Sequence, residues 1–319
     1  MNEILTKIHD IGIIPVIAID DASRAVPLAE ALVRGGLPAA EVTFRTEAAE
    51  EAIREIVSKV PQMLVGAGTV LTKEQADRAI AAGARFIVSP GFNPEITGYV
   101  IDKGVCMLPG TATAGEMEQA MMLGLKAVKF FPAEQNGGVE KLKALAGPYR
   151  GLYWMPTGGV NTGNLYDYLS FPQVLACGGT WMVKKDLIEN EKWDQITSIC
   201  KDAVKTMLGF EIRHIGINIE DEEEAVQSAR TLCALFDLEY RPGDASIFAG
   251  TGFEIMKRVQ KGKYGHIAVA VSDVDRAIYH LARRGALFDE DTRKSDGKGT
   301  KFIYLRGEIG GFAIHLVRK

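Results

Sequence analysis

Residues 125–134 read LKAVKFFPAE, a short apolar segment typical of a β-strand that stops at the helix-breaking Pro132. In the middle of this segment stands Lys129, flanked by Val128 and Phe130. Apolar surroundings disfavour the charged ammonium, and a neutral amine is the nucleophile that forms a Schiff base with a carbonyl. The alternative is a structural lysine at a strand end whose ammonium reaches water. The segment alone leaves both interpretations open.

This strand belongs to a regular alternation of strand-like and helix-like segments that continues to about residue 208. Strict alternation implies parallel strands, and eight βα repeats in a segment of this length favour a compact (β/α)8 TIM barrel over an open doubly wound sheet. We therefore expect an α/β barrel domain over residues 1–208. The expected strands cover residues 12–19, 40–44, 63–67, 86–88, 106–108, 127–131, 153–155 and 174–177.

Composition limits the classes of protein to which this chain can belong. Of its 319 residues, 47% are hydrophobic and 24% charged, with a formal net charge of -4. These values are ordinary for a soluble protein, and the negative charge argues against nucleic acid or an anionic membrane surface as a partner. The N-terminus lacks the order of a signal peptide, and no uncharged apolar run approaches the ~20 residues of a membrane span. We expect a cytoplasmic protein with no membrane partner.

Four cysteines, Cys106, Cys177, Cys200 and Cys233, stand far apart without any paired spacing. This pattern disfavours both a disulfide framework and a cysteine zinc site. We expect the four thiols to act as small buried hydrophobic groups.

The segment after the second expected strand, residues 41–46, carries both charges and apolar residues in alternation. Strand alternation puts Glu41, Thr43 and Arg45 on one face, and Val42 and Phe44 on the other. Since the apolar pair should face the surrounding helices, the carboxylate and the guanidinium should point into the barrel. Buried charges are rarely retained without a partner or a task. The alternative is a structural ion pair between Glu41 and Arg45 that closes the end of the barrel.

Two later strands are followed by glycine pairs, Gly158-Gly159 and Gly178-Gly179. In many barrels the loops after strands seven and eight bind phosphate through backbone N–H groups and the N-terminus of a short helix. Paired glycines also occur in plain turns, so this signal is only moderately specific.

Together, six ordered motifs resemble the family of 2-keto-3-deoxy-6-phosphogluconate (KDPG) and 4-hydroxy-2-oxoglutarate (KHG) aldolases. The resemblance covers roughly residues 1–208 and implies a metal-free Schiff-base aldolase that needs no cofactor. It further implies a (β/α)8 barrel in a homotrimer or higher homo-oligomer, which cleaves a 2-keto-4-hydroxy acid to pyruvate and an aldehyde. The six motifs are residues 41–46 (EVTFRT), 66–69 (GAGT), 89–92 (SPGF), 129–134 (KFFPAE), 156–160 (PTGGV) and 178–181 (GGTW).

The resemblance also implies a role for individual residues. Lys129 would attack the C2 carbonyl of the keto acid, and Glu41 would be the general acid and base. Arg45 and Thr69 would hold the substrate carboxylate, for which a guanidinium fork is suited. Many phosphogluconate-type members carry serine where this chain has threonine at position 180. The residues expected to bind substrate are Arg45, Thr69, Pro90, Phe131, Thr157, Gly158, Gly159, Gly179 and Thr180.

The sequence leaves two questions about the barrel open. The aldehyde product is either glyceraldehyde 3-phosphate or glyoxylate. A functional alternative is a barrel that binds a sugar acid without turnover, with the activity or regulation residing in the C-terminal domain. A nucleophile and a proton shuttle at one site favour the aldolase.

From residue 209 the pattern changes to a smaller α+β domain, over residues 209–319, with two βαβββ modules. The first module opens with a strand at 211–219 and a helix at 221–236, and the second with a strand at 265–271 and a helix at 274–284. The polar segment 289–299 is expected to be a mobile loop.

Similar openings of the two modules, His214-Ile215-Gly216 and Gly265-His266-Ile267, resemble the vicinal-oxygen-chelate superfamily, which includes glyoxalases. The resemblance implies metal ligands on the first and last strand of each module. The corresponding positions are His214, Glu254, His266 and His315, and the last is usually a glutamate in that family. Three imidazoles and one carboxylate suit a divalent transition metal such as zinc, nickel, iron or manganese.

Overall fold

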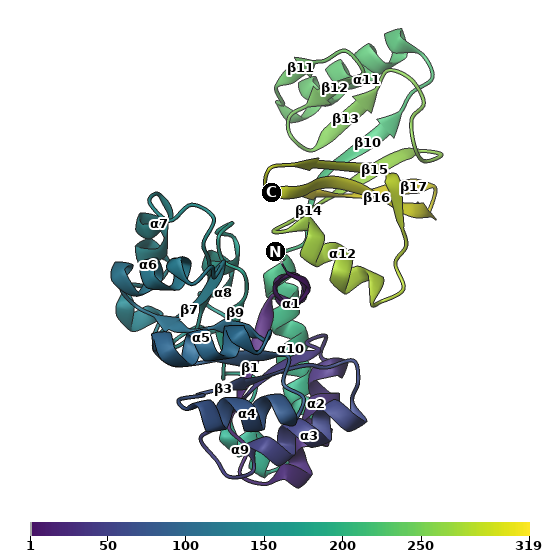
Figure 1. Ribbon diagram of the computed structural model, residues 1–319. Coiled ribbons are helices and arrows are strands. Elements are labelled where there is room, and N and C mark those ends of the chain that lie inside the picture. Colours follow the sequence, from purple (N-terminus) through teal and green to yellow (C-terminus); the bar gives the residue numbers. More distant parts are fainter. Residues whose placement is uncertain (1) are drawn as a thin grey trace. The chain divides into compact units, whose positions relative to one another are not determined.

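The computed structural model describes residues 2–319 of the chain (Figure 1). Contacts divide the chain into two compact units, of which the first ends at Met207 and the second begins at Leu208. Each unit has its own core. Among the described residues, no helix is both long enough and apolar enough to cross a bilayer.

The strands of the first unit are short, and all their pairings are parallel. They are nearly completely buried, as parallel strands covered by helices usually are. In chain order the strands are β1 (Ile13–Ile17), β2 (Ala39–Thr43), β3 (Leu64–Gly68), β4 (Phe86–Val88), β5 (Cys106–Leu108), β6 (Gly110–Thr111), β7 (Ala127–Phe130), β8 (Tyr153–Pro156) and β9 (Cys177–Gly179).

The pairings of these strands follow a circuit. One sheet has the order β5-β4-β3-β2-β1-β9 and another the order β6-β7-β8. Two isolated bridges, Trp154 to Val174 and Thr157 to Gly178, continue from β8 towards β9. At the other end, β5 and β6 are separated only by Pro109. The result is a curled parallel sheet, so the expected α/β class is confirmed.

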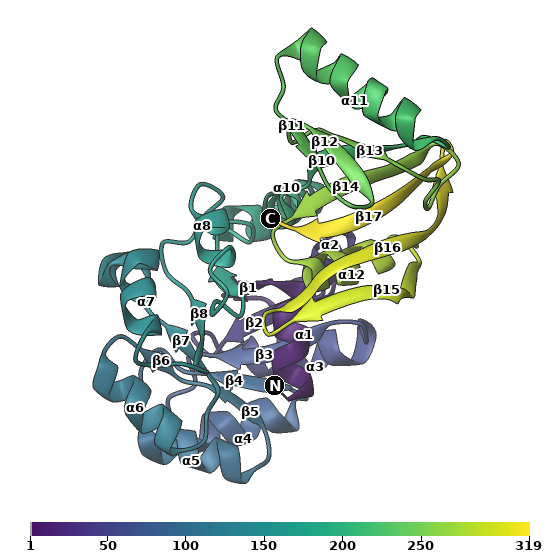
Figure 2. The same cartoon turned by 90° about the horizontal axis from the view of Figure 1, so that it is seen from above.

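Helices surround the curled sheet (Figures 1 and 2). Each of the longer ones buries one side, and several begin at a side chain that accepts a backbone N–H, as with the capping box of Thr113 and Glu116. The helices are α1 (Glu3–Ile11), α2 (Ala25–Arg34), α3 (Ala49–Lys59), α4 (Lys73–Ala81), α5 (Pro94–Asp102), α6 (Ala114–Met122), α7 (Gly138–Ala146), α8 (Leu165–Leu169), α9 (Lys185–Glu189) and α10 (Trp193–Leu208), with the 3-10 turns η1 (Ala22–Arg24) and η2 (Glu134–Asn136).

The first unit differs from the expectation in its helix α1 and in its last strand, and also contains β6 and α9, which were not expected. Helix α1 precedes the first strand, with Asn2 as its N-cap and Leu5, Ile8 and Ile11 on its buried side. The last strand was expected at 174–177 but β9 covers Cys177–Gly179. Its two glycines have little intrinsic preference for a strand, and pairing with β1 decides its position.

The second unit contains an eight-stranded sheet of order β11-β12-β13-β10-β14-β17-β16-β15. The second unit consists of two modules with the same order of elements: one strand, one helix and then three strands (Figure 2). Ala225 and Ala229 of the first helix pack on Ile247 and Ile255 of the sheet. The elements are β10 (Glu211–Asn218), α11 (Glu222–Phe236), β11 (Tyr240–Pro242), β12 (Ser246–Ala249), β13 (Phe253–Met256), β14 (Gly265–Val271), α12 (Val274–Ala282), β15 (Phe288–Asp296), β16 (Gly299–Ile309) and β17 (Phe312–Arg318).

The expectation of a mobile loop at 289–299 is wrong, because most of this segment forms strand β15 and pairs with β16 in an antiparallel hairpin. β15 is an edge strand, and most of its residues are exposed or half-buried. The strand therefore needs no apolar alternation, and its charged residues suit an exposed edge. Nothing in its composition marked it as a strand.

Candidate active site

Lys129 and Glu41 form a buried ion pair inside the first unit. The Lys129 Nζ donates a hydrogen bond to Glu41 Oε1 at 3.1 Å, from β7 to β2. Lys129 is 5% exposed and Glu41 0% exposed. The second carboxylate oxygen, Glu41 Oε2, is also buried and has no hydrogen-bond partner among the described residues. The pair is thus an amine beside a carboxylate that has one unpartnered oxygen among the described residues.

The neighbours of this pair fix its position. Gly68, the last residue of β3, lies so close to the carboxylate that a Cβ there would overlap with Glu41 Oε1. Across the pair, the Lys129 Nζ lies 5.2 Å from the centroid of the Phe131 ring. Glu41 and Thr43 are 0% and 1% exposed, but Val42 is also 0% exposed, so burial does not distinguish the two faces of β2. The contact of Glu41 with Lys129 on β7 agrees with the predicted inward orientation of the carboxylate.

Arg45 does not lie where the sequence indicated. It was expected to point into the barrel, but its side chain is exposed, because β2 ends at Thr43 and Arg45 belongs to the loop that follows. The alternative of a structural ion pair between Glu41 and Arg45 is also wrong, since the ion-pair partner of Glu41 is Lys129. Arg45 Nε donates instead to Thr69 Oγ1 at 3.2 Å. These two side chains, which were expected to hold a carboxylate together, are in contact.

The loops after β7, β8 and β9 lie side by side. A Cβ at Gly158 would be 3.3 Å from the Phe131 ring, so these two residues are neighbours. Thr157 is buried and forms a parallel bridge with Gly178. Gly179 is buried against the Trp181 ring, and the next residue, Thr180, is exposed. Phe131, Thr157, Gly158, Gly179 and Thr180, which were expected to bind substrate, therefore lie at the carboxyl ends of β7, β8 and β9.

Pro90 adjoins the same strands through its backbone. Its carbonyl oxygen lies against Gly110, which is the strand partner of Lys129 in β6. Pro90 therefore lies near β7, the strand that carries Lys129, but none of these contacts involves the Lys129 side chain.

A family assignment follows from comparison with known proteins. The sequence model of the KDPG and KHG aldolase family matches residues 4–199. The chain belongs to the KDPG and KHG aldolase family. The matched residues all lie in the first unit, which carries the Lys129–Glu41 pair.

Individual relatives in this aldolase family agree with the assignment. The 2-dehydro-3-deoxy-phosphogluconate aldolase of Haemophilus influenzae is 46% identical over 203 residues, which cover 64% of this chain and 96% of the relative. The KHG/KDPG aldolase of Escherichia coli is 44% identical over 193 residues, covering 60% of this chain and 91% of the relative. A crystal structure of KDPG aldolase from Legionella pneumophila, with pyruvate captured as a covalent carbinolamine intermediate, aligns with a TM-score of 0.61 and 38% identity, covering 62% of this chain and 97% of that one.

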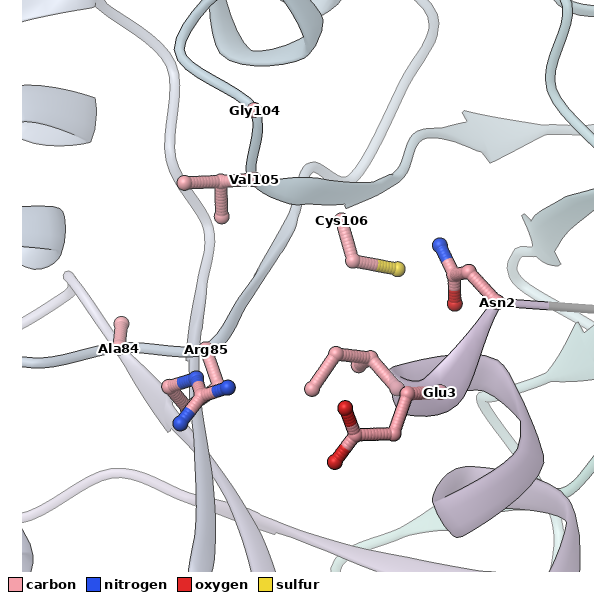
Figure 3. Close-up of a pocket in the computed structure, with 8 residues that line it drawn as sticks. Asn2, Glu3, Ala84, Arg85, Gly104, Val105 and Cys106 are labelled. Atoms are coloured by element: carbon pink, nitrogen blue, oxygen red, sulfur yellow. The ribbon is translucent and has the colours of Figure 1, made fainter.

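A separate, open cavity of about 270 Å³ lies beside α1 and the amino ends of β4 and β5 (Figure 3). Its lining includes Asn2, Glu3, Arg85 and Cys106, and none of the residues assigned to the aldolase site. Burial raises the pKa of the Cys106 thiol to about 11, so the thiol stays protonated at neutral pH. The cavity therefore offers no thiolate nucleophile at neutral pH. Cys177 and Cys200 are buried as expected, whereas Cys106 and Cys233 are only half-buried.

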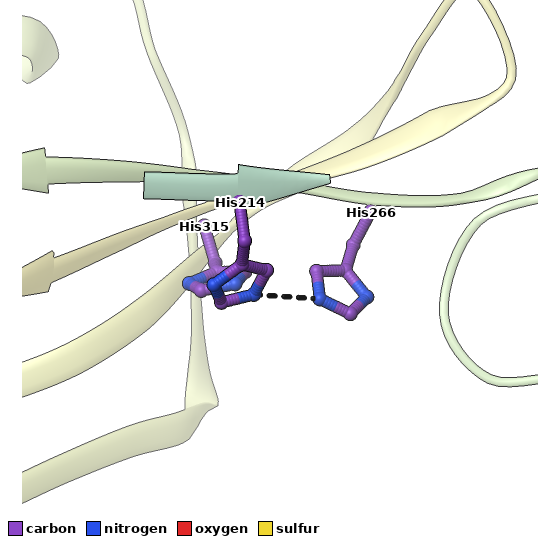
Figure 4. Close-up of side chains that lie close together, drawn as sticks. All are labelled: His214, His266 and His315. Atoms are coloured by element: carbon purple, nitrogen blue, oxygen red, sulfur yellow. Dashed lines mark hydrogen bonds between the residues drawn. The ribbon is translucent and has the colours of Figure 1, made fainter. Parts of the chain in front are cut away.

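In the second unit, the four predicted metal-ligand positions lie on one face of the sheet. Gly216 of β10 pairs with both His266 and Glu254, and Ala268 of β14 pairs with both His214 and His315. Side chains alternate along each strand, so all four point to the same side. One ring nitrogen from each of the three histidines lies within 4.8 Å of the others (Figure 4).

Glu254 joins this histidine cluster. Its Oε2 lies 3.1 Å from the Nε2 atoms of both His214 and His266, and these two nitrogens are 3.1 Å apart. Ser246 donates to its Oε1 at 2.6 Å. Sequence reasoning missed Ser246, although it lies two residues from Phe248, the strand partner of Glu254, and so on the same face.

The surroundings decide the charges in this cluster. Burial by itself would raise the pKa of Glu254, but hydrogen bonds with His214, His266 and Ser246 hold it well below its usual range. Burial and the two neighbouring imidazoles lower the pKa of His315 to about 3, so this ring is neutral at pH 7. The Nδ1 atoms of His266 and His315 are buried without a hydrogen-bond partner among the described residues. A carboxylate and neutral imidazoles are what a transition metal requires of its ligands.

Proposed function

We propose that the first unit is a Schiff-base aldolase on a (β/α)8 barrel, which reversibly cleaves a 2-keto-4-hydroxy acid to pyruvate and an aldehyde. The observation that carries the proposal is the buried Lys129 beside Glu41, with Glu41 Oε2 free to accept a further hydrogen bond. The circuit of parallel pairings supports the barrel. The covalent carbinolamine in the Legionella relative is an adduct of the kind that such a lysine forms.

In this mechanism the pair first exchanges a proton, which leaves Lys129 as the neutral amine and Glu41 as the acid. Lys129 Nζ adds to the C2 carbonyl, and loss of water gives a protonated imine. The imine accepts the electron pair of the C3–C4 bond while Glu41, again a carboxylate, takes the proton of the C4 hydroxyl. The aldehyde leaves, C3 of the enamine is protonated, and hydrolysis of the imine releases pyruvate and restores the lysine.

The remaining residues would bind the two ends of the substrate. Arg45 and Thr69, already in contact, would hold the C1 carboxylate, with Phe131 and Pro90 beside the reacting carbons. The turn groups of Thr157, Gly158, Gly159, Gly179 and Thr180 would hold the far end, and backbone N–H groups of glycine turns suit a phosphate. We therefore favour 2-keto-3-deoxy-6-phosphogluconate over 4-hydroxy-2-oxoglutarate as the substrate. The homotrimer remains a prediction of the resemblance.

A sugar-acid-binding barrel without turnover is the alternative. Such a protein would have no use for a nucleophile 3.1 Å from a proton acceptor, and burying both charges is costly. The geometry therefore favours catalysis.

Replacement of Lys129 tests the proposal directly. We expect Lys129→Ala to abolish pyruvate formation from 2-keto-3-deoxy-6-phosphogluconate, because no other group can form the imine at this position. Lys126→Ala is the matched control, since Lys126 precedes the same strand but is exposed. A coupled assay for pyruvate measures both variants. Wild-type turnover by Lys129→Ala would refute the assignment.

Replacement of Glu41 tests the proton shuttle. Glu41→Gln keeps the shape of the side chain but removes its basicity, so we expect kcat to fall on the order of 10²–10⁴. Glu51→Gln is a control, since Glu51 is an exposed residue of α3 paired with Arg54. If Glu41→Gln retained the wild-type kcat, Glu41 would be no more than the structural partner of Lys129.

For the second unit we propose a domain of the vicinal-oxygen-chelate type that binds one divalent transition metal through His214, Glu254, His266 and His315. The mutual distances of 3.1 Å among three ligand atoms resemble the roughly 3.0–3.4 Å expected around a metal bound at about 2.1 Å. The two unpartnered Nδ1 atoms belong to rings whose other nitrogen would face the metal. When bound, such a metal supplies a Lewis acid.

Metal analysis tests this second proposal. After reconstitution of the full chain with Zn²⁺ and removal of free ion, we expect one equivalent by elemental analysis, and its loss in His266→Ala. His9→Gln is the control, since His9 lies in α1 of the first unit. Pyruvate formation should survive chelation, because the aldolase residues include no part of this cluster. Absence of bound zinc, nickel, iron and manganese from the reconstituted wild-type chain would leave a hydrogen-bonded cluster without a metal.

A further inference from the structure

Glu134 links two of the loops that carry the proposed aldolase site. It follows Lys129 by five positions and opens the turn η2. Its backbone N–H donates to the carbonyl of Gly158 at 3.1 Å, and the N–H of Ala133 donates to that of Thr157 at 2.8 Å. The loop after the lysine strand is therefore bonded along its backbone to the glycine turn after β8.

The Glu134 side chain makes a second link. Its Oε1 accepts a hydrogen bond from the hydroxyl of Tyr168, a residue of α8 that is 1% exposed. Helix α8 begins just after the glycine turn. Burial, followed by this hydrogen bond to Glu134, raises the pKa of the Tyr168 phenol above its ordinary value, so the phenol remains a donor throughout the neutral pH range.

The Glu134 side chain also packs directly against the backbone of the Gly158–Gly159 turn. Gly159 has a φ of +81°, and a Cβ there would overlap with the Cβ and Cγ of Glu134. Two amide groups, from Asn161 and Asn164, donate to the Gly159 carbonyl at 3.0 and 3.2 Å. The backbone of Gly159 is thus held between the Glu134 side chain and a pair of amides, with Tyr168 fixing the position of Glu134.

We propose that Glu134 and Tyr168 are a positioning pair, which holds the Gly158–Gly159 turn in the shape that binds a phosphate ester at the far end of the substrate. This inference rests on the proposed aldolase function. The pair touches neither Lys129 nor Glu41 in any hydrogen bond or ion pair of the described residues, so its effect is on selection of the phosphorylated substrate. The chemistry at C2 does not depend on it.

Removal of one hydroxyl tests the proposal. For Tyr168→Phe we expect the kcat/KM for 2-keto-3-deoxy-6-phosphogluconate to fall about tenfold through KM, as loss of one part-buried hydrogen bond to a carboxylate permits. The kcat/KM for the unphosphorylated 2-keto-3-deoxygluconate should change less than about twofold, so the ratio of the two values falls. Glu134→Ala should act in the same way, whereas Glu134→Gln, which keeps a carbonyl acceptor, should retain most of the ratio.

Tyr149→Phe is the matched control, because Tyr149 is also buried and donates to a glutamate, Glu118, at 2.9 Å. The hydrogen bond from Tyr149 to Glu118 does not involve the glycine turn. Removal of the Tyr149 hydroxyl should therefore leave the ratio of the two kcat/KM values unchanged. An unchanged ratio in Tyr168→Phe, or an equal loss for both substrates, would overturn the positioning role. A wild-type chain that does not prefer the phosphorylated substrate would also overturn it.

Exchange of the pyruvate methyl protons with D₂O separates this inference from the function on which it rests. The exchange needs the imine and a proton acceptor but no far-end contact, so Tyr168→Phe should exchange at the wild-type rate. Loss of exchange in Tyr168→Phe would contradict a role limited to the far end. Failure of the wild-type chain itself to exchange would overturn the proposed aldolase function, and the inference with it.

Discussion

The ion pair between Lys129 and Glu41 is the interaction around which the first unit is arranged. Both side chains are almost fully removed from water, and one oxygen of Glu41 has no partner among the described residues. Desolvating two charges in this way costs several kcal/mol for each ion, and an apolar pair of similar size would serve stability as well or better. The arrangement therefore argues for chemistry at this position, and Gly68 provides the space that the carboxylate needs.

Parallel strands explain how residues so far apart in sequence meet. Glu41 and Lys129 are 88 positions apart, but each lies on a strand of one curled sheet whose carboxyl ends share an edge. The glycine turns after β8 and β9 reach the same edge. The second unit uses register in a comparable way, since the pairings of β10, β13, β14 and β17 bring three histidines and a glutamate to one face.

Much of this could be predicted from the sequence, because its strongest signals are local. A lysine in an apolar strand and a charged residue alternating with Val42 and Phe44 both follow from strand periodicity. The positions of the clustered histidines followed from the resemblance of the two modules to the vicinal-oxygen-chelate superfamily. The two wrong expectations, for Arg45 and for residues 289–299, arose because the sequence does not reveal where a strand ends or whether it lies at the exposed edge of a sheet. Arg45 is exposed because β2 ends two residues before it, and β15 carries charges because it is an edge strand. The link from Glu134 to Tyr168 could not be predicted, since it depends on the packing of α8.

The most direct test of the account is the identity of the atom that carries the substrate. The full chain is incubated with pyruvate, reduced with sodium borohydride, digested and mapped by mass spectrometry. We expect a single reduced three-carbon adduct, on the Nζ of Lys129, that is absent when borohydride is omitted. An adduct on another lysine, or no adduct under conditions where pyruvate-forming turnover is measured, would contradict it.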